Sequence, residues 1–101
     1  MKSIAEKTAM IASIASDFHK TCGGEILFKV SSFKMETAPN YGEIKLFPTQ
    51  EDLGEINIFI YSNSLIIQAP LGPAHRFGEY LRDELNALKK DIGIPCELQG
   101  I

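Results

Sequence analysis

The spacing of the apolar residues changes twice along the chain, and this pattern limits the fold more than any other feature. Near the N-terminus apolar residues recur every three or four positions, as on one face of an α-helix. Between residues 25 and 69 they alternate with polar residues, which is typical of β-strands. From Pro73 onwards the helical spacing returns. Because 101 residues suffice for one compact domain, the sequence predicts a single α+β domain over residues 1–101.

The first helix is predicted to begin at Ser3. Ser3 and Glu6 have the spacing of a capping box, in which their side chains satisfy backbone N–H groups left open at a helix start. Gly23-Gly24 supplies the glycine that commonly ends a helix, so the helix is expected to extend to Cys22. Its apolar stripe consists of Ile4, Thr8, Ile11, Ala15, Phe18 and Cys22.

Four antiparallel strands are expected next, within residues 25–33, 43–47, 55–61 and 65–69, and residues 34–42 are expected to form a loop. The tight connection Ser62-Asn63-Ser64 predicts that the last two strands form a hairpin. One set of alternate residues is apolar enough to face the helices. This set contains Ile26, Phe28, Val30, Ile44, Leu46, Ile56, Ile58, Ile60, Leu65 and Ile67.

The second helix is predicted to have Pro73 in its first turn, where the missing N–H is not needed, and to end at Gly93. Its apolar stripe consists of Phe77, Leu81, Leu85, Leu88 and Ile92. Residues 94–101 are expected to add a short C-terminal edge strand or to pack on the domain. The order helix, four antiparallel strands, helix predicts a two-layer α+β sandwich with both helices on one face of the sheet.

This order of elements is similar to that of frataxin-like domains and of bacterial secretion chaperones. The first helix lacks the dense acidic ridge of frataxins, and the second strand–helix half of the usual chaperone is absent. Because topology alone does not define activity, the sequence assigns no family.

The face of the sheet away from the helices is predicted to carry an apolar cluster. It contains Leu27, Phe47, Phe59, Tyr61 and Ile66, among the polar residues Lys29, Ser31, Lys45, Asn57 and Gln68. Such a cluster on a monomer usually marks an interface, and most homo-oligomers are two-fold dimers, so a homodimer is expected. The alternative is that the C-terminal tail or the loop over residues 34–42 covers the cluster.

A second candidate site lies at the start of the second helix. His75 and Arg76 place potential cations where the helix dipole disfavours them, and with Tyr41 and Tyr80 they suggest a binding site for an anion or a small ligand. A pocket between sheet and helices beside these residues would suit a small-ligand or anion-binding protein or a modest enzyme. The simpler interpretation is that acids such as Glu79 satisfy the charges.

No catalytic residue, cofactor or metal is predicted. Cys22 and Cys96 lie far apart without a Cys-x-x-Cys spacing, and His19 and His75 are also distant, so no set of metal ligands is visible. The sequence contains no nucleophile elbow, phosphate loop or dinucleotide fingerprint. An enzyme is therefore not the favoured interpretation.

Charge and hydropathy limit the partners. Thirteen acidic against ten basic residues give a net charge of −3, which disfavours binding to nucleic acid. The uncharged run near the N-terminus, Thr8 to Ser16, is shorter than the roughly twenty apolar residues of a membrane span, and a cytoplasmic protein is expected. Together these features predict a small acidic, non-enzymatic protein-interaction domain of the adaptor, chaperone, immunity-protein or inhibitor type, acting as a homodimer. The identity of any other partner is not contained in the sequence.

Overall fold

The computed structural model describes residues 3–17, 19–22, 25–49, 54–88 and 93–100. They form two helices and a six-stranded sheet whose strands are arranged in sequence order. Neighbouring strands are antiparallel except for the last pair, which is parallel. The elements are α1 (Ile4–Asp17), β1 (His19–Cys22), β2 (Glu25–Thr37), β3 (Gly42–Pro48), β4 (Ile56–Ile60), β5 (Leu65–Ala69), α2 (Pro73–Ala87) and β6 (Cys96–Gly100).

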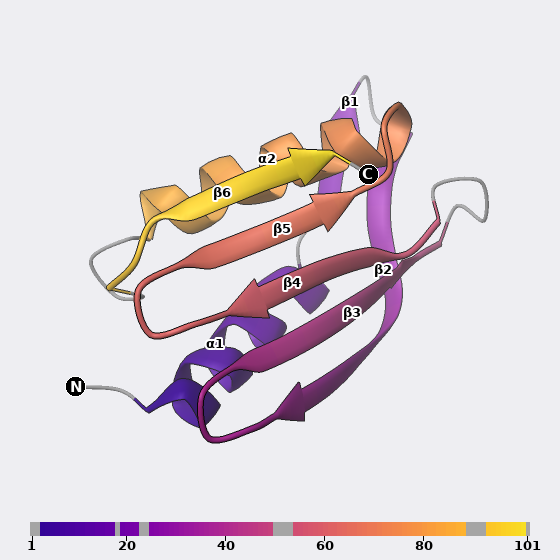
Figure 1. Cartoon of the computed structure of the whole chain (residues 1–101). Coiled ribbons are helices and arrows are strands. Elements are labelled where there is room, and N and C mark those ends of the chain that lie inside the picture. The colour runs from indigo at the N-terminus through magenta and orange to yellow at the C-terminus, as the bar shows by residue number, and fades with distance from the viewer. Residues whose placement is uncertain (1–2, 18, 23–24, 50–53, 89–92, 101) are drawn as a thin grey trace.

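Both helices cover the same face of the sheet, which confirms the predicted two-layer α+β sandwich (Figure 1). The central strands send alternate side chains into the layer between sheet and helices, as their period-two pattern requires. All of these side chains are fully buried, and all belong to the predicted inward set: Ile44, Leu46, Ile56, Ile58, Ile60, Leu65 and Ile67. The side chains of Ile26 and Phe28 lie outside the described residues.

Helix α1 begins at the predicted cap and lies tightly on the sheet. The backbone N–H of Glu6 donates to Ser3 Oγ at 3.1 Å, and the Ser3 hydroxyl donates to the Glu6 carboxylate at 3.2 Å. One turn later, the buried Thr8 lies against Gly42 at the start of β3. A Cβ at Gly42 would overlap the Thr8 hydroxyl, so glycine allows this close approach of helix and strand.

Helix α2 begins at Pro73 as predicted, and the C-terminal residues form the expected edge strand, β6. Because α2 crosses over the sheet between β5 and β6, these two strands run parallel. The side chain of Asn86 holds the start of β6. Asn86 Oδ1 accepts from the backbone N–H of Cys96 at 2.8 Å, and Asn86 Nδ2 donates to the carbonyl of Cys96 at 3.2 Å.

The predicted end of the first helix is wrong. Helix α1 ends at Asp17, and His19–Cys22 form β1, which pairs with the first part of β2. The capping residues Gly23-Gly24 lie outside the described residues, but Cys22 pairs with Glu25, so two residues connect β1 and β2. A Gly-Gly pair suits a two-residue hairpin connection as well as a helix end, and pairing with β2 satisfies the backbone of residues 19–22 as a strand.

The predicted loop over residues 34–42 is also wrong, because β2 continues to Thr37 and a short turn leads into β3. The β2–β3 register shifts between Val30 and Ser32, and this irregularity moves the alternation by one residue. As a result, Phe33 and Met35 lie on the helix-facing side of the sheet opposite Leu46 and Ile44. They lie at its margin and are 41% and 44% exposed.

Candidate functional site

The face of the sheet turned away from the helices is called the outer face here. Pairing across β2–β6 places its side chains in two neighbouring rows that run across the strands. The first row contains Glu36, Glu43, Phe59, Ile66 and Glu97. The second row contains Lys34, Lys45, Asn57, Gln68 and Gln99. The outer face therefore combines apolar, charged and amide side chains, whereas the helix-facing side of β3–β5 is apolar.

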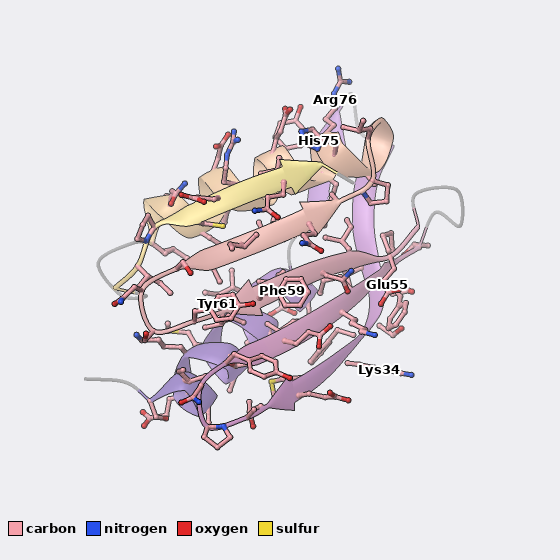
Figure 2. The ribbon with its side chains drawn as sticks, viewed as in Figure 1. Lys34, Glu55, Phe59, Tyr61, His75 and Arg76 are labelled. Carbon is pink, nitrogen blue, oxygen red and sulfur yellow. The ribbon has the colours of Figure 1, made fainter. Side chains whose placement is uncertain are left out.

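Four of the five residues predicted for the apolar interface lie within β3–β5 or directly beside them. Phe59 pairs with Ile66 across β4 and β5, and both side chains are half-buried. Tyr61 follows β4, is 39% exposed and lies near Tyr41, with 6.4 Å between the ring centroids. Figure 2 shows Phe59 and Tyr61 together on the face away from the helices. The outer-face cluster is defined here as Phe47, Phe59, Tyr61 and Ile66.

Leu27, the fifth predicted interface residue, lies in the part of β2 that pairs with β1, before the β2–β3 pairing begins at Val30. Its side chain lies outside the described residues.

The two segments expected as alternative covers of the cluster are used elsewhere in the described structure. Residues 96–100 form β6 beside β5, and residues 34–37 extend β2 beside β3. Both segments are therefore part of the sheet itself. A strand within a sheet cannot also lie across the face of that sheet, so the tail and the loop do not cover the cluster over these residues.

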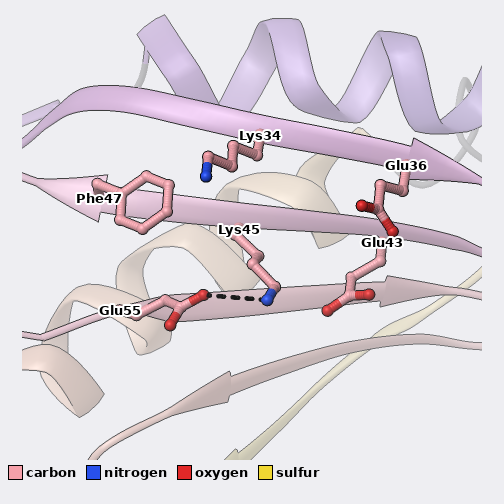
Figure 3. Close-up of a pocket in the computed structure, with 6 residues that line it drawn as sticks. All are labelled: Lys34, Glu36, Glu43, Lys45, Phe47 and Glu55. Atoms are coloured by element: carbon pink, nitrogen blue, oxygen red, sulfur yellow. Dashed lines mark ion pairs between the residues drawn. The ribbon is translucent and has the colours of Figure 1, made fainter.

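A charged hollow of about 350 Å³ lies next to the cluster over β2, β3 and the start of β4 (Figure 3). Lys45 Nζ lies 3.7 Å from Glu55 Oε1, and Lys34 Nζ lies 5.9 Å from the centroid of the Phe47 ring. Ion pairs between exposed side chains of this kind contribute little stability. The hollow is lined by Lys34, Glu36, Glu43, Lys45, Phe47 and Glu55.

The hollow has an unusual charge order. Lys34 lies directly opposite Lys45, and Glu36 lies directly opposite Glu43. Like charges directly opposite each other destabilise a pair of strands. No ion pair within the described part of the chain joins either glutamate of these pairs to either lysine, and the compensating acid beside Lys45 is Glu55, from outside the two pairs. Lys34, Glu36, Glu43 and Lys45 are called the charge quartet here.

Two members of the quartet, Lys34 and Glu36, were not expected on the outer face, because residues 34–42 were interpreted as a loop. The signal was present in Lys34-Met35-Glu36, where charged and apolar residues alternate with the period of a strand. The bulge at Val30/Ser32 hides the continuation, because it interrupts the alternation that begins at residue 25.

Three of the four residues of the predicted anion or ligand site lie on α2, where Arg76 and Tyr80 are one turn apart, but Tyr41 lies at the other end of the sheet. Tyr41 precedes Gly42, and Gly42 pairs with Ile60 at the end of the sheet where β5 begins. His75 lies beside Gly100, at the edge where β5 and β6 end. Tyr80 follows His75 along α2, and Figure 2 shows Arg76 projecting from the start of that helix. The layer between sheet and helices contains the cluster of buried apolar side chains.

The contacts of His75 agree with the simpler interpretation of the start of α2. His75 Nε2 lies 3.7 Å from Glu79 Oε1, one helical turn along α2. The neighbouring acid lies beside one ring nitrogen of His75, and the other, Nδ1, is buried without a hydrogen-bond partner among the described residues.

Cys96 is a buried free cysteine at the start of β6. Burial raises the pKa of its thiol to about 12 by disfavouring the charged thiolate. A neutral thiol packs as a small apolar group and is a poor nucleophile. The side chains of His19 and Cys22, the other residues considered for thiol or metal chemistry, lie outside the described residues.

Within the described ranges, no group of three or more His, Cys, Asp and Glu side chains is placed to hold a metal ion. Among the described residues, no helix is long and apolar enough to span a membrane. No protein-family model, curated protein or solved structure matches this chain.

Proposed function

We propose that the protein is a non-enzymatic protein-interaction domain, of the adaptor, chaperone, immunity-protein or inhibitor type, that forms a homodimer through its outer face. The observation that carries this proposal is the position of the outer-face cluster. Phe47, Phe59, Tyr61 and Ile66 share one side of the sheet, and both helices lie on the other. A concentrated apolar surface of this kind is typical of an interface.

Two sheets can pack back to back through such a surface, about 10 Å apart, with interleaved side chains. Phe59 and Ile66 are only half-buried in the protomer, so each has apolar surface left to remove from water. Complete burial of one such side chain contributes about 1.5–3 kcal/mol relative to full exposure, so each contributes part of that amount here. The aromatic residues Phe59 and Tyr61 are of the type that often dominates binding energy at the centre of an interface.

The competing function has less support. It is that of a small-ligand or anion-binding protein, or of a modest enzyme. Its expected pocket lies between sheet and helices, where the described residues include a cluster of buried apolar side chains. The hollow on the outer face carries Glu36, Glu43 and Glu55 beside its two lysines, which disfavours a polyanion such as nucleic acid.

We place the dimer in the cytoplasm, where a free cysteine such as Cys96 stays reduced.

Matched phenylalanine substitutions test the proposal. Phe59→Ala removes a ring from the outer face, and Phe33→Ala removes a ring from the exposed margin on the helix-facing side. Sedimentation velocity at micromolar concentration should show a dimer for the wild type and for Phe33→Ala. Phe59→Ala should raise the dimer Kd by about tenfold or more, as expected for an interface aromatic. A monomeric wild type, or equal masses for the two variants and the wild type, would refute dimerisation through this face.

A further inference from the structure

We infer that the charge quartet makes the outer face complementary to itself and fixes how a second copy binds. This inference rests on the proposed homodimer and adds the orientation of the two copies and the residues that select a like partner. Its starting point is the order of Lys34 opposite Lys45 beside Glu36 opposite Glu43. Glu55 pairs with Lys45 at 3.7 Å, and over the described residues no ion pair joins the lysines of the quartet to its glutamates.

The quartet forms two short rows of opposite charge. Lys34 and Glu36 are two residues apart on β2, and Lys45 and Glu43 are two residues apart on β3. The lysine row and the glutamate row are therefore separated by about 7 Å along the strands. All four side chains line the same hollow on the outer face (Figure 3).

A two-fold axis that runs across the strands, midway between these rows, exchanges them. A second copy related by this axis places its glutamate row over the lysine row of the first copy, and its lysine row over the glutamates. Glu36 then faces Lys34 of the second copy, and Glu43 faces Lys45 of the second copy. Four intermolecular ion pairs then add to the exposed Lys45–Glu55 pair of each protomer and offset the two like-charge pairs. The sheet separation of about 10 Å suits an extended lysine meeting a glutamate.

The same axis also brings apolar side chains of the outer-face cluster into the interface. Phe59 and Ile66 lie in the glutamate row on β4 and β5, next to Asn57 and Gln68 in the lysine row. The rotation places each copy's Phe59 and Ile66 over the partner's Asn57 and Gln68, so the apolar side chains of the two copies lie diagonally beside each other, next to the ion pairs. The arrangement therefore combines an apolar centre with a charged flank, as many interfaces do.

A two-fold axis parallel to the strands lacks this complementarity. Such an axis places the glutamate row of one copy over the glutamate row of the other, and the lysine row over the lysine row. With the axis between β2 and β3, Glu36 would face Glu43 of the second copy and Lys34 would face Lys45 of the second copy. Like charges brought together at an interface repel each other and disfavour such pairings. The charge order thus selects one orientation of a second copy.

A charge-reversal experiment on the full chain tests this orientation. The first variant combines Lys34→Glu with Lys45→Glu, which makes both rows acidic. The second combines Glu36→Lys with Glu43→Lys, which makes both rows basic. Each variant alone should have a dimer Kd raised by about 100-fold, because every ion pair becomes a like-charge pair. An equimolar mixture should form a heterodimer, because every acidic row then meets a basic one.

Sedimentation velocity on each variant and on the mixture gives the readout, with far-ultraviolet circular dichroism to show that each variant is folded. Monomeric single variants and a dimeric mixture support the inference. Homodimers of unchanged affinity, or a mixture that stays monomeric while both variants are folded, overturn it. In either of these cases a dimeric wild type that is weakened by Phe59→Ala would leave the proposed function intact. A monomeric wild type would refute the proposed function as well.

Discussion

The two faces of the sheet are built from the same strands, yet they differ sharply in chemistry. Towards the helices, β3, β4 and β5 present fully buried aliphatic side chains, five of which are isoleucines. Towards the outside, the same strands present Glu43, Lys45 and Phe59 among other mixed side chains. The neighbours Ile58 and Phe59 belong to opposite faces. The helix-facing side therefore specifies the protomer, and the outer face has the composition of a surface that meets a partner.

The largest expected effect concerns the helix-facing side. Ile58→Ala should lower the free energy of unfolding by about 2–5 kcal/mol, because Ile58 is fully buried and the alanine leaves a cavity. Urea denaturation at low protein concentration measures this loss on the protomer. Phe59→Ala in the same assay should cost less, since its side chain is only half-buried. Equal losses for these neighbours would break the distinction between the two faces.

The next effect uses Cys96 as a reporter of burial between sheet and helices. Its pKa rises from 9.0 to about 12, so the folded protein keeps the thiol protonated where the unfolded chain loses the proton. Stability from this group is present below pH 9 and is lost as pH rises towards about 12, by up to about 1.4 kcal/mol per pH unit.

Cys96→Ala supplies the control for this pH dependence. Urea denaturation between pH 8 and 10.5 should show a steeper loss of stability for the wild type than for Cys96→Ala, with the difference opening above pH 9. Parallel curves would mean that the thiol is exposed and that the β6 side of the core is more open than the structure shows.

The smallest effect is expected at the margin of the sheet. Met35→Lys changes a side chain that is 44% exposed on β2, so the free energy of unfolding should change by no more than about 0.5 kcal/mol. The dimer Kd should also stay the same, because Met35 faces the side away from the proposed interface. Loss of the dimer in this variant would move the interface from the outer face to the edge of β2.

The regular centre of the fold could be predicted from the sequence. Residues 44–46, 56–60 and 65–67 alternate strictly, so each strand has two sets of side chains that point to opposite faces. One set is far more apolar than the other, and this identifies the buried side chains. The start of α2 at Pro73 was also predictable from a local signal, and the edge strand β6 was one of the two outcomes expected for residues 94–101. These elements depend on patterns that neighbouring residues carry by themselves.

The β1–β2 region could not be predicted in the same way. The helical spacing of apolar residues continues past Asp17, yet His19–Cys22 form a strand because they pair with β2. This pairing is a tertiary contact, and the spacing of residues within one segment does not reveal it. The shift between Val30 and Ser32 reverses which residues of β2 face the helices, and nothing in the local sequence marks it. The charge quartet depends on that shift, so it became visible only when β2 and β3 were seen paired.

The most direct test of the central claim is the mass of the wild-type protein in solution by sedimentation equilibrium across micromolar concentrations. One chain has a mass of 11.2 kDa. Dimerisation through the outer face predicts twice this mass at the higher concentrations, falling towards the single-chain mass on dilution. A mass of 11.2 kDa throughout that range would contradict the account.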